Sequence, residues 1–369
     1  MTLETPMQTS PLIGNDPVPD EVIERIARAR EALGRHVLVL GHHYQRDEVI
    51  QFADFRGDSL DLAMRARDSG DVRHVVFCGV HFMAETADML TPDGVKVILP
   101  DMRAGCSMAD MADIDQVEIA WDVLTGATDK KIVPITYINS TAALKAFCGR
   151  HGGAVCTSSN AKAVVRWAFE QGEKVLFFPD QHLGRNTCYD LGIGLDDMVV
   201  YDPHDPHEMT GGNDPKVYDE SRVILWRGHC SVHTNFMENH PDIMRQRYPG
   251  IKVLVHPECR FEVVRKADVA GSTRVIVETV RNAPPGTKWA IGTEHHLVNR
   301  LRQEHPEQFV STLAPFACQC STMFRISAEA LADRLEELAR GEERNVIPVD
   351  PETTRWALIA LDRMLDMRD

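Results

Sequence analysis

Three cysteines each follow a short apolar run at a separate point of the chain. Cys106 comes after VILPDMRAG, Cys230 after VILWRGH, and Cys320 after FVSTLAPFACQ. Short apolar runs of this kind predict buried β-strands. Three thiolates at three strand ends can hold three irons of a 4Fe-4S cluster and leave the fourth iron open. Because an open iron is a Lewis acid, the pattern predicts a catalytic cluster, one per chain, with three cysteine ligands.

The other cysteines leave one alternative for the third ligand. Cys318 lies two residues before Cys320, so either thiol could reach the cluster. A free cysteine is most often a small buried hydrophobic residue. We expect that role for Cys78, Cys148, Cys156, Cys188 and Cys259.

An internal repeat gives the three cysteines a common position. Each of three consecutive segments has four strand-like runs, with a Ser or Thr at the second run and a cysteine after the fourth. The spacing is similar, since Ser59 and Gly79 are 20 residues apart, as are Ser272 and Gly292. Strands that alternate with helices predict an α/β fold with parallel sheets. Three such units around an axis would bring the cysteines to one point, because ligand sites lie at the carboxyl ends of parallel strands.

The repeat also predicts where each unit begins and ends. We expect a disordered tail over 1–19, a first α/β unit over 20–125, a second over 126–235, and a third over 236–369 that includes a C-terminal helix. The tail contains four prolines and lacks the apolar core of a signal peptide. The stretch 185–220, rich in Gly, Pro and Asp, lengthens the second unit and is interpreted as a surface insertion.

Pairs of polar residues follow the first strand of each unit. The members of a pair are two positions apart, which places both side chains on one face of an extended strand. Around a common axis, these pairs would surround the cluster with acid–base groups and hydrogen-bond donors. The pairs are His42 and Tyr44, Tyr137 and Asn139, and His256 and Glu258.

Small hydroxyl residues mark the second strand-like run of each unit. They are Ser59 in FRGDS, Ser158 in CTSSNA, and Ser272 with Thr273 in AGSTR. Helix N-capping explains any one of them taken alone. The same geometry offers hydroxyl and backbone N–H groups to a phosphate or carboxylate. Three of these around one pocket predict a small polyanionic substrate.

Composition limits the partners and the location. The chain has 369 residues, a formal net charge of −15 and no basic tract, which argues against nucleic-acid and membrane partners. No apolar run approaches the roughly 18 residues needed to cross a bilayer. We therefore expect a cytoplasmic protein whose nine cysteines stay reduced.

Two other classes of function fit parts of the sequence. A zinc hydrolase using His256 and Glu258 is one alternative, because the chain has 16 histidines, although compact zinc sites usually show CxxC or HxxxH spacing. A non-catalytic iron–sulfur sensor is the other. Such a protein usually carries a DNA-binding motif or a basic face, and neither is evident in the sequence.

Several motifs occur in the order that is typical of quinolinate synthases. They run from about Val37 to Met323 and read GHHYQ, ADFRGDSL, GVHFMAET, TYINST, CTSSNA, HPEC and AGST. The chain is similar to the longer branch of this family, given the insertion before Cys230. The resemblance implies three pseudo-threefold-related α/β/α sandwich domains, with short parallel sheets around a central 4Fe-4S cluster.

The same resemblance implies an activity and the cluster ligands. Family members condense iminoaspartate with dihydroxyacetone phosphate to quinolinate, with loss of phosphate and water, in NAD biosynthesis. An enzyme that produces iminoaspartate is then the expected functional partner. The implied ligands are Cys106, Cys230 and Cys320. The third is preferred to Cys318 because the family's third ligand precedes a Met by three residues, as Cys320 does here.

Substrate and proton-transfer residues are also implied by the resemblance. Tyr44, Glu258 and His256 are the expected catalytic residues, with Tyr44 and Glu258 as the main proton-transfer groups. Glu258 would suit this role if burial raised its pKa toward neutrality. The residues expected to bind substrate are His42, Ser59, Tyr137, Asn139, Ser158, His256, Glu258 and Thr273.

Overall fold

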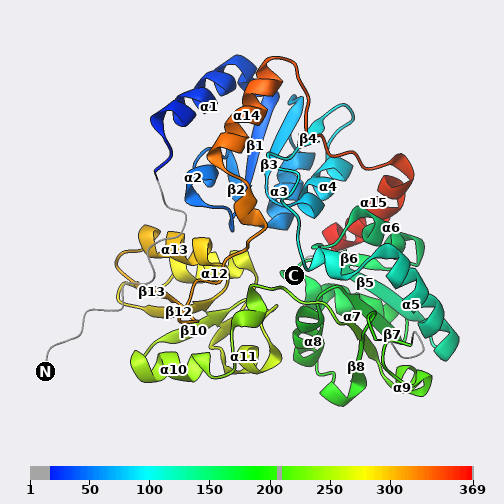
Figure 1. Cartoon of the computed structure of the whole chain (residues 1–369). Coiled ribbons are helices and arrows are strands. Elements are labelled where there is room, and N and C mark those ends of the chain that lie inside the picture. Colours follow the sequence, from blue (N-terminus) through cyan, green and yellow to red (C-terminus); the bar gives the residue numbers. More distant parts are fainter. Residues whose placement is uncertain (1–16, 206–209, 368–369) are drawn as a thin grey trace, which may run out of the picture.

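Three parallel sheets lie around a common centre, with helices packed on both faces of the first sheet and beside the other two (Figure 1). The computed structural model describes residues 17–205 and 210–367. Within these ranges, every pairing between the named strands is parallel. The predicted fold class, α/β with three short parallel sheets flanked by helices, is confirmed.

Strand order is the same in the three sheets, with the first strand of each unit lying inside. In spatial order, the first sheet contains β2 (Phe55–Gly57), β1 (Val37–His42), β3 (His74–Cys78) and β4 (Lys96–Ile98). The second contains β6 (Ala154–Cys156), β5 (Ile132–Tyr137), β7 (Lys174–Phe178), β9 (Val223–Trp226) and β8 (Met198–Tyr201). The third contains β11 (Val269–Ala270), β10 (Lys252–Val255), β12 (Lys288–Gly292) and β13 (Phe309–Thr312).

Helices connect the strands of each sheet, as parallel pairing requires. Those beside the first sheet are α1 (Asp20–Leu33), α2 (Asp47–Ile50), α3 (Ser59–Arg67) and α4 (His81–Leu90). Those beside the second sheet are α6 (Ala142–Arg150), α7 (Ala161–Gln171), α8 (Gln181–Asp190), α9 (Pro215–Glu220) and α5 (Ile114–Ala127), most of which falls within the expected first unit of 20–125. The third has α10 (His240–Arg247), α11 (Phe261–Lys266), α12 (Thr273–Arg281) and α13 (His295–Glu304), and the chain then continues through α14 (Ala328–Ala339) and α15 (Pro351–Asp366). Short 3₁₀ helices occupy Gly34–His36, Ala109–Met111, Leu195–Asp197, His233–Asn235 and Met323–Arg325.

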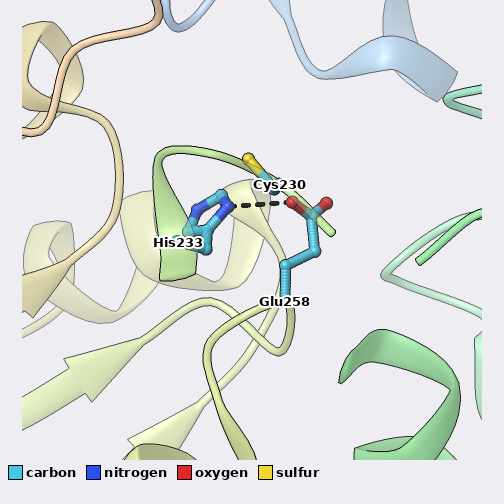
Figure 2. A group of neighbouring side chains, drawn as sticks. All are labelled: Cys230, His233 and Glu258. Carbon is cyan, nitrogen blue, oxygen red and sulfur yellow. Dashed lines mark hydrogen bonds and ion pairs between the residues drawn. The ribbon is translucent and has the colours of Figure 1, made fainter. Parts of the chain in front are cut away.

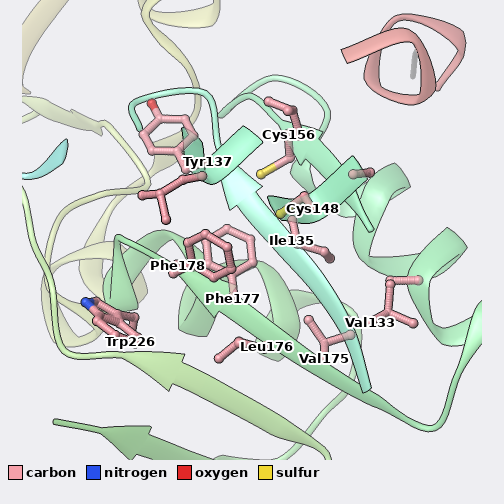
Figure 3. Close-up of a cluster of buried hydrophobic side chains, with 14 of the residues drawn as sticks. Val133, Ile135, Tyr137, Cys148, Cys156, Val175, Leu176, Phe177, Phe178 and Trp226 are labelled. Carbon is pink, nitrogen blue, oxygen red and sulfur yellow. The ribbon is translucent and has the colours of Figure 1, made fainter. Parts of the chain in front are cut away.

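The second sheet shows how apolar strands fix the position of a polar residue. All five residues of β7 are buried, and Phe177, Phe178 and Trp226 are fully enclosed. Tyr137 lies at the carboxyl end of β5, above this apolar cluster (Figure 3). Its ring is therefore anchored in the core, while its hydroxyl projects beyond the strand end.

The stretch 185–220 differs from the sequence interpretation. Arg185, placed in a surface insertion over 185–220, lies in α8, which follows β7 as α4 follows β3. The added chain between α8 and β9 contains β8, an edge strand whose Tyr201 stacks on Trp226 with ring centroids 5.5 Å apart. A four-residue strand is easily hidden among Gly, Pro and Asp residues.

The C-terminal helices, predicted within the third unit over 236–369, pack on the other two units. Helix α14 lies against α1, where Arg25 forms an ion pair with Asp333 at 2.6 Å (Figure 1). Helix α15 lies against α6 and β6, and buries Leu361 in the core of the second sheet. An amphipathic pattern predicts a buried face but does not specify which sheet it covers.

Most of the expected N-terminal tail, residues 1–16, lies outside the described residues. Among the helices that the structure describes, none combines the length and apolar character needed to span a membrane.

Candidate active site

The carboxyl ends of strands from all three sheets surround a cavity. Its lining comes from all three units. Cys106, Cys230 and Cys320 all contribute to it, each from the segment that follows the last strand of its unit in chain order. The predicted convergence of these three positions is therefore present in the structure.

The backbone around each of these cysteines has the same conformation. The carbonyl oxygen of the cysteine accepts a hydrogen bond from the residue four positions later, at 3.0 Å for Cys106, 3.1 Å for Cys230 and 3.0 Å for Cys320. A 3₁₀ helix begins three residues after each cysteine. The backbone N–H groups at this third position, on Ala109, His233 and Met323, donate to the cysteine sulfurs.

The three thiols fit a site for a positively charged metal group. Burial, and then the neighbouring Cys320, raise the pKa of Cys106 to about 12. The pKa of Cys230 is raised by burial, then by Glu258 and by the other two thiols. Three buried sulfurs that repel one another as thiolates need a bound cation to become ligands together. The N–H groups directed at the sulfurs are the outer hydrogen bonds expected around such ligands.

Cys318 has a different environment. It lies in the apolar core of the third sheet, with 1% of its surface exposed. Its carbonyl oxygen accepts a hydrogen bond from His295, at 2.9 Å, instead of from a following 3₁₀ helix. The geometry therefore favours Cys320 over Cys318 as the residue that faces the cavity.

Every residue expected to act on the substrate lines the same cavity. These residues are His42, Tyr44, Ser59, Tyr137, Asn139, Ser158, His256, Glu258 and Thr273.

The pairs after the first strands differ from prediction in their backbone conformation. Strand β1 ends at His42 and β10 ends at Val255, so Tyr44 and Glu258 lie in turns instead of on extended strand. In each turn the histidine ring accepts a hydrogen bond from the backbone two residues later. Nδ1 of His42 accepts a hydrogen bond from the Tyr44 N–H at 3.1 Å, and Nδ1 of His256 accepts one from the Glu258 N–H at 3.3 Å.

These hydrogen bonds set the tautomer of both histidines. Burial lowers the pKa of His42 and of His256 to about 3, so both rings are neutral at physiological pH. Because Nδ1 is an acceptor in each ring, the remaining proton is on Nε2. His42 and His256 therefore each carry an Nε2–H donor.

Of the hydroxyl residues, Ser272 is a helix cap, whereas Ser59 and Thr273 are not. Asp58 caps α3, accepting from the Leu60 N–H at 3.0 Å, and Ser272 caps α12, accepting from the Val275 N–H at 3.4 Å. The hydroxyls of Ser59 and Thr273, one residue further on, line the cavity instead. The alternative of simple N-capping thus applies to their neighbours.

Glu258 forms a buried network with residues that the sequence interpretation missed. Nδ1 of His233 lies 2.8 Å from Oε2 of Glu258, and its Nε2 lies 3.2 Å from Oγ1 of Thr293. Thr293 in turn lies 2.9 Å from the hydroxyl of Tyr44. The spacing Cys230-Ser-Val-His233 is a C-x-x-H signal that could have identified His233.

The pKa of Glu258 is not raised toward neutrality. Burial alone would raise this pKa, but nearby His256 and His233, with hydrogen bonds from His233 and Tyr137, lower it to about 2. The pKa values of Tyr44 and Tyr137 are raised well above the usual range, mainly by burial and then by Glu258. Glu258 is therefore a carboxylate that accepts hydrogen bonds, and the two tyrosines keep their protons.

One group of side chains could also hold a single metal ion. Possible ligand atoms of Cys230, His233 and Glu258 all lie within 4.8 Å of one another (Figure 2). The zinc alternative named His256 with Glu258. In the structure, however, the ring of His233 faces Glu258 directly and the ring of His256 stacks on His233, with centroids 4.6 Å apart.

Comparison with known proteins agrees with this arrangement. Residues 24–366 match the family model described as Quinolinate synthetase A protein. The chain is 55% identical over 348 residues to a Bacillus cereus protein named "Quinolinate synthase", covering 94% of this chain and 93% of the relative. It is 56% identical over 361 residues to a Rhodopirellula baltica protein of the same name, covering 95% and 92%. These names denote enzymes, and the chain belongs to the quinolinate synthetase A protein family.

Proposed function

We propose that this enzyme condenses iminoaspartate with dihydroxyacetone phosphate to form quinolinate, releasing phosphate and water, as a step in NAD biosynthesis. The names of its relatives support the product. The observation that carries the proposal is the cavity in which three equivalent cysteines meet the paired acid–base residues and the hydroxyl residues of all three units.

We assign Cys106, Cys230 and Cys320 as ligands of one 4Fe-4S cluster per chain. The support is their common backbone conformation and the N–H groups directed at each sulfur. When bound through three cysteines, such a cluster supplies an open iron that acts as a Lewis acid toward an oxygen of the reacting molecule.

Neutral donors would bind the two anionic substrates. Across the described ranges, neither Lys nor Arg is among the residues that line the cavity. Ser59, Ser158 and Thr273 lie at or near the N-termini of three helices, where hydroxyl and backbone N–H groups can hold phosphate or carboxylate. The Nε2–H groups of His42 and His256 add two more donors, and Asn139 adds a side-chain amide.

The proton-transfer steps fall to Tyr44 and Glu258, which are joined by hydrogen bonds. Because the Glu258 carboxylate can only accept, Nδ1 of His233 must donate to it, and in the neutral ring Nε2 then accepts from Thr293. The Thr293 oxygen remains free to accept from the Tyr44 hydroxyl. In this direction, Tyr44 passes a proton along the chain toward Glu258 only as it takes one from a reacting group, so that its own hydroxyl stays protonated. His256, stacked on His233, keeps that ring in place and presents its own donor.

The proposed reaction requires a source of iminoaspartate. We infer a functional link to an enzyme that produces this compound, and we place the reaction in the cytoplasm, where thiols remain reduced.

Metal analysis tests the proposal against the two alternatives. After anaerobic purification, the chain should be brown, with about four irons and four sulfides and no zinc. A colourless protein with one zinc would support a hydrolase and refute the cluster. A four-iron protein that forms no quinolinate from the two substrates would support the sensor.

A further inference from the structure

Arg300 joins the third unit to the segment of the first unit that carries Tyr44. Arg300 lies on α13 and is 6% exposed. Its Nη1 donates to the carbonyl oxygen of His43 at 2.9 Å, and its Nη2 donates to the carbonyl oxygen of Gln45 at 2.7 Å. Its Nε donates to Oδ1 of Asp47 at 2.8 Å. The guanidinium therefore binds the backbone carbonyl oxygens on both sides of Tyr44.

The side chain of Tyr44 is held by the same unit. Its hydroxyl lies 3.0 Å from Oγ1 of Thr273 and 2.9 Å from Oγ1 of Thr293, which belong to the third unit. The edge of its ring meets the ring of His42, with centroids 4.8 Å apart. Tyr44 thus comes from the first unit but is fixed, at its backbone and at its hydroxyl, by the third.

We propose that Arg300 is a positioning residue that places the Tyr44 hydroxyl within reach of Thr293. The inference rests on the role of Tyr44 in the proposed function. A planar guanidinium offers donors in a fixed fork, which suits acceptors on both sides of one residue. An ammonium group lacks this fixed fork, so Arg300→Lys is not expected to keep all three contacts of Arg300 in the same geometry.

A second contact keeps the segment attached when Arg300 is changed. Nε of Arg46 donates to the carbonyl oxygen of Ile326 at 3.1 Å, and its guanidinium lies 4.3 Å from the centroid of the Phe324 ring. Loss of the Arg300 fork should therefore displace Tyr44 without unfolding the segment. A displacement on the order of 1 Å at a reacting group can lower a rate by about 100-fold.

Hydrogen exchange and kinetics of the iron-loaded protein test the inference together. Arg300→Met and Arg300→Lys should speed amide exchange over residues 43–47 and lower kcat by about 10- to 100-fold, with a much smaller change in KM. Arg302→Met is the matched control, because Arg302 lies on the same helix but donates to the carbonyl oxygen of Val310 within the third unit, at 2.8 Å. In Arg302→Met, amide hydrogen exchange over residues 43–47 and kcat should both match those of the wild type.

A double-mutant cycle shows whether Arg300 acts through Tyr44. In a Tyr44→Phe background, Arg300→Met should cause no further loss of kcat, because the hydroxyl that it positions is absent. Unchanged exchange over 43–47, or losses that multiply in the double variant, would overturn the inference. If Tyr44→Phe alone keeps wild-type turnover, the proton-transfer role of Tyr44 is wrong and the catalytic effect assigned to Arg300 falls with it, whereas the exchange data still decide whether Arg300 holds the segment.

Discussion

Replacing Cys320 and Cys318 separately should give opposite results, although the two thiols are two residues apart. Cys320→Ala removes a sulfur that lines the cavity. We expect iron, sulfide and activity to be lost together, while the unfolding free energy of the metal-free chain changes by less than about 0.5 kcal/mol. Cys318→Ala removes a core sulfur that is 1% exposed. We expect full iron and turnover, with about 1–2 kcal/mol less unfolding free energy, as for loss of a small buried apolar group.

The assay combines iron and sulfide analysis of anaerobic preparations with urea unfolding of the metal-free chains. Each variant serves as the control for the other, because the local sequence and expression conditions are the same. Iron retained by Cys320→Ala and lost by Cys318→Ala would refute the assignment of the third ligand. Iron retained by both variants would refute the three-cysteine site.

Substitutions at three further residues test the hydrogen-bond network and the pKa of His43. Glu258→Gln keeps the side-chain shape but not the carboxylate, so kcat should fall by about 10²- to 10⁴-fold with iron retained; turnover near the wild-type value would remove Glu258 from the mechanism. Thr293→Val should lower kcat by about tenfold or more, whereas Thr293→Ser, which keeps the hydroxyl, should not; equal rates would show that no proton passes through Thr293. The pKa of His43 is lowered to about 4 by burial and then by nearby arginines. As the pH is lowered from 6.5 to 4, the unfolded chain therefore takes up a proton at His43 that the folded chain does not. The unfolding free energy decreases as the pH is lowered through this range. From pH 7 to pH 5 the wild type should lose about 1–2 kcal/mol more unfolding free energy than His43→Gln, measured in urea, and an equal loss would contradict the pKa shift.

The placement of the three cysteines was predictable from sequence because it follows from topology. Parallel strands with a repeated order bring equivalent carboxyl ends to one centre. The common position of Cys106 and Cys230, each just after an apolar run, was therefore enough to predict that they lie close together. Hydroxyl residues such as Ser59 were placed for the same reason, although the choice between cap and ligand required the geometry of Asp58.

The electrostatics of Glu258 were not predictable from the same pattern. Its pKa depends on His233, which is 25 residues away and is brought close by the turn after Cys230. Thr293 is a further 35 residues along the chain from Glu258 and completes the link to Tyr44 only through the packing of the third sheet on the first. Burial predicts a raised pKa, and only specific contacts can reverse it.

The hydrogen bonds of Arg300 and the packing of the C-terminal helices were likewise not predictable from the sequence. Both depend on which surfaces of the three units meet. Residues 328–366 have clear amphipathic patterns, but the pattern is equally compatible with any of the three sheets. Contacts between units are therefore the part of the fold that the structure adds.

The reaction itself provides the most direct test. Anaerobically purified chain is supplied with dihydroxyacetone phosphate and with iminoaspartate generated in the assay, and quinolinate and phosphate are measured over time, with Cys106→Ala as the inactive control. We predict that quinolinate and phosphate appear in equal amounts with the wild type, and that neither exceeds the background with Cys106→Ala. An iron-loaded wild-type protein that forms no more quinolinate than Cys106→Ala would contradict the proposed function.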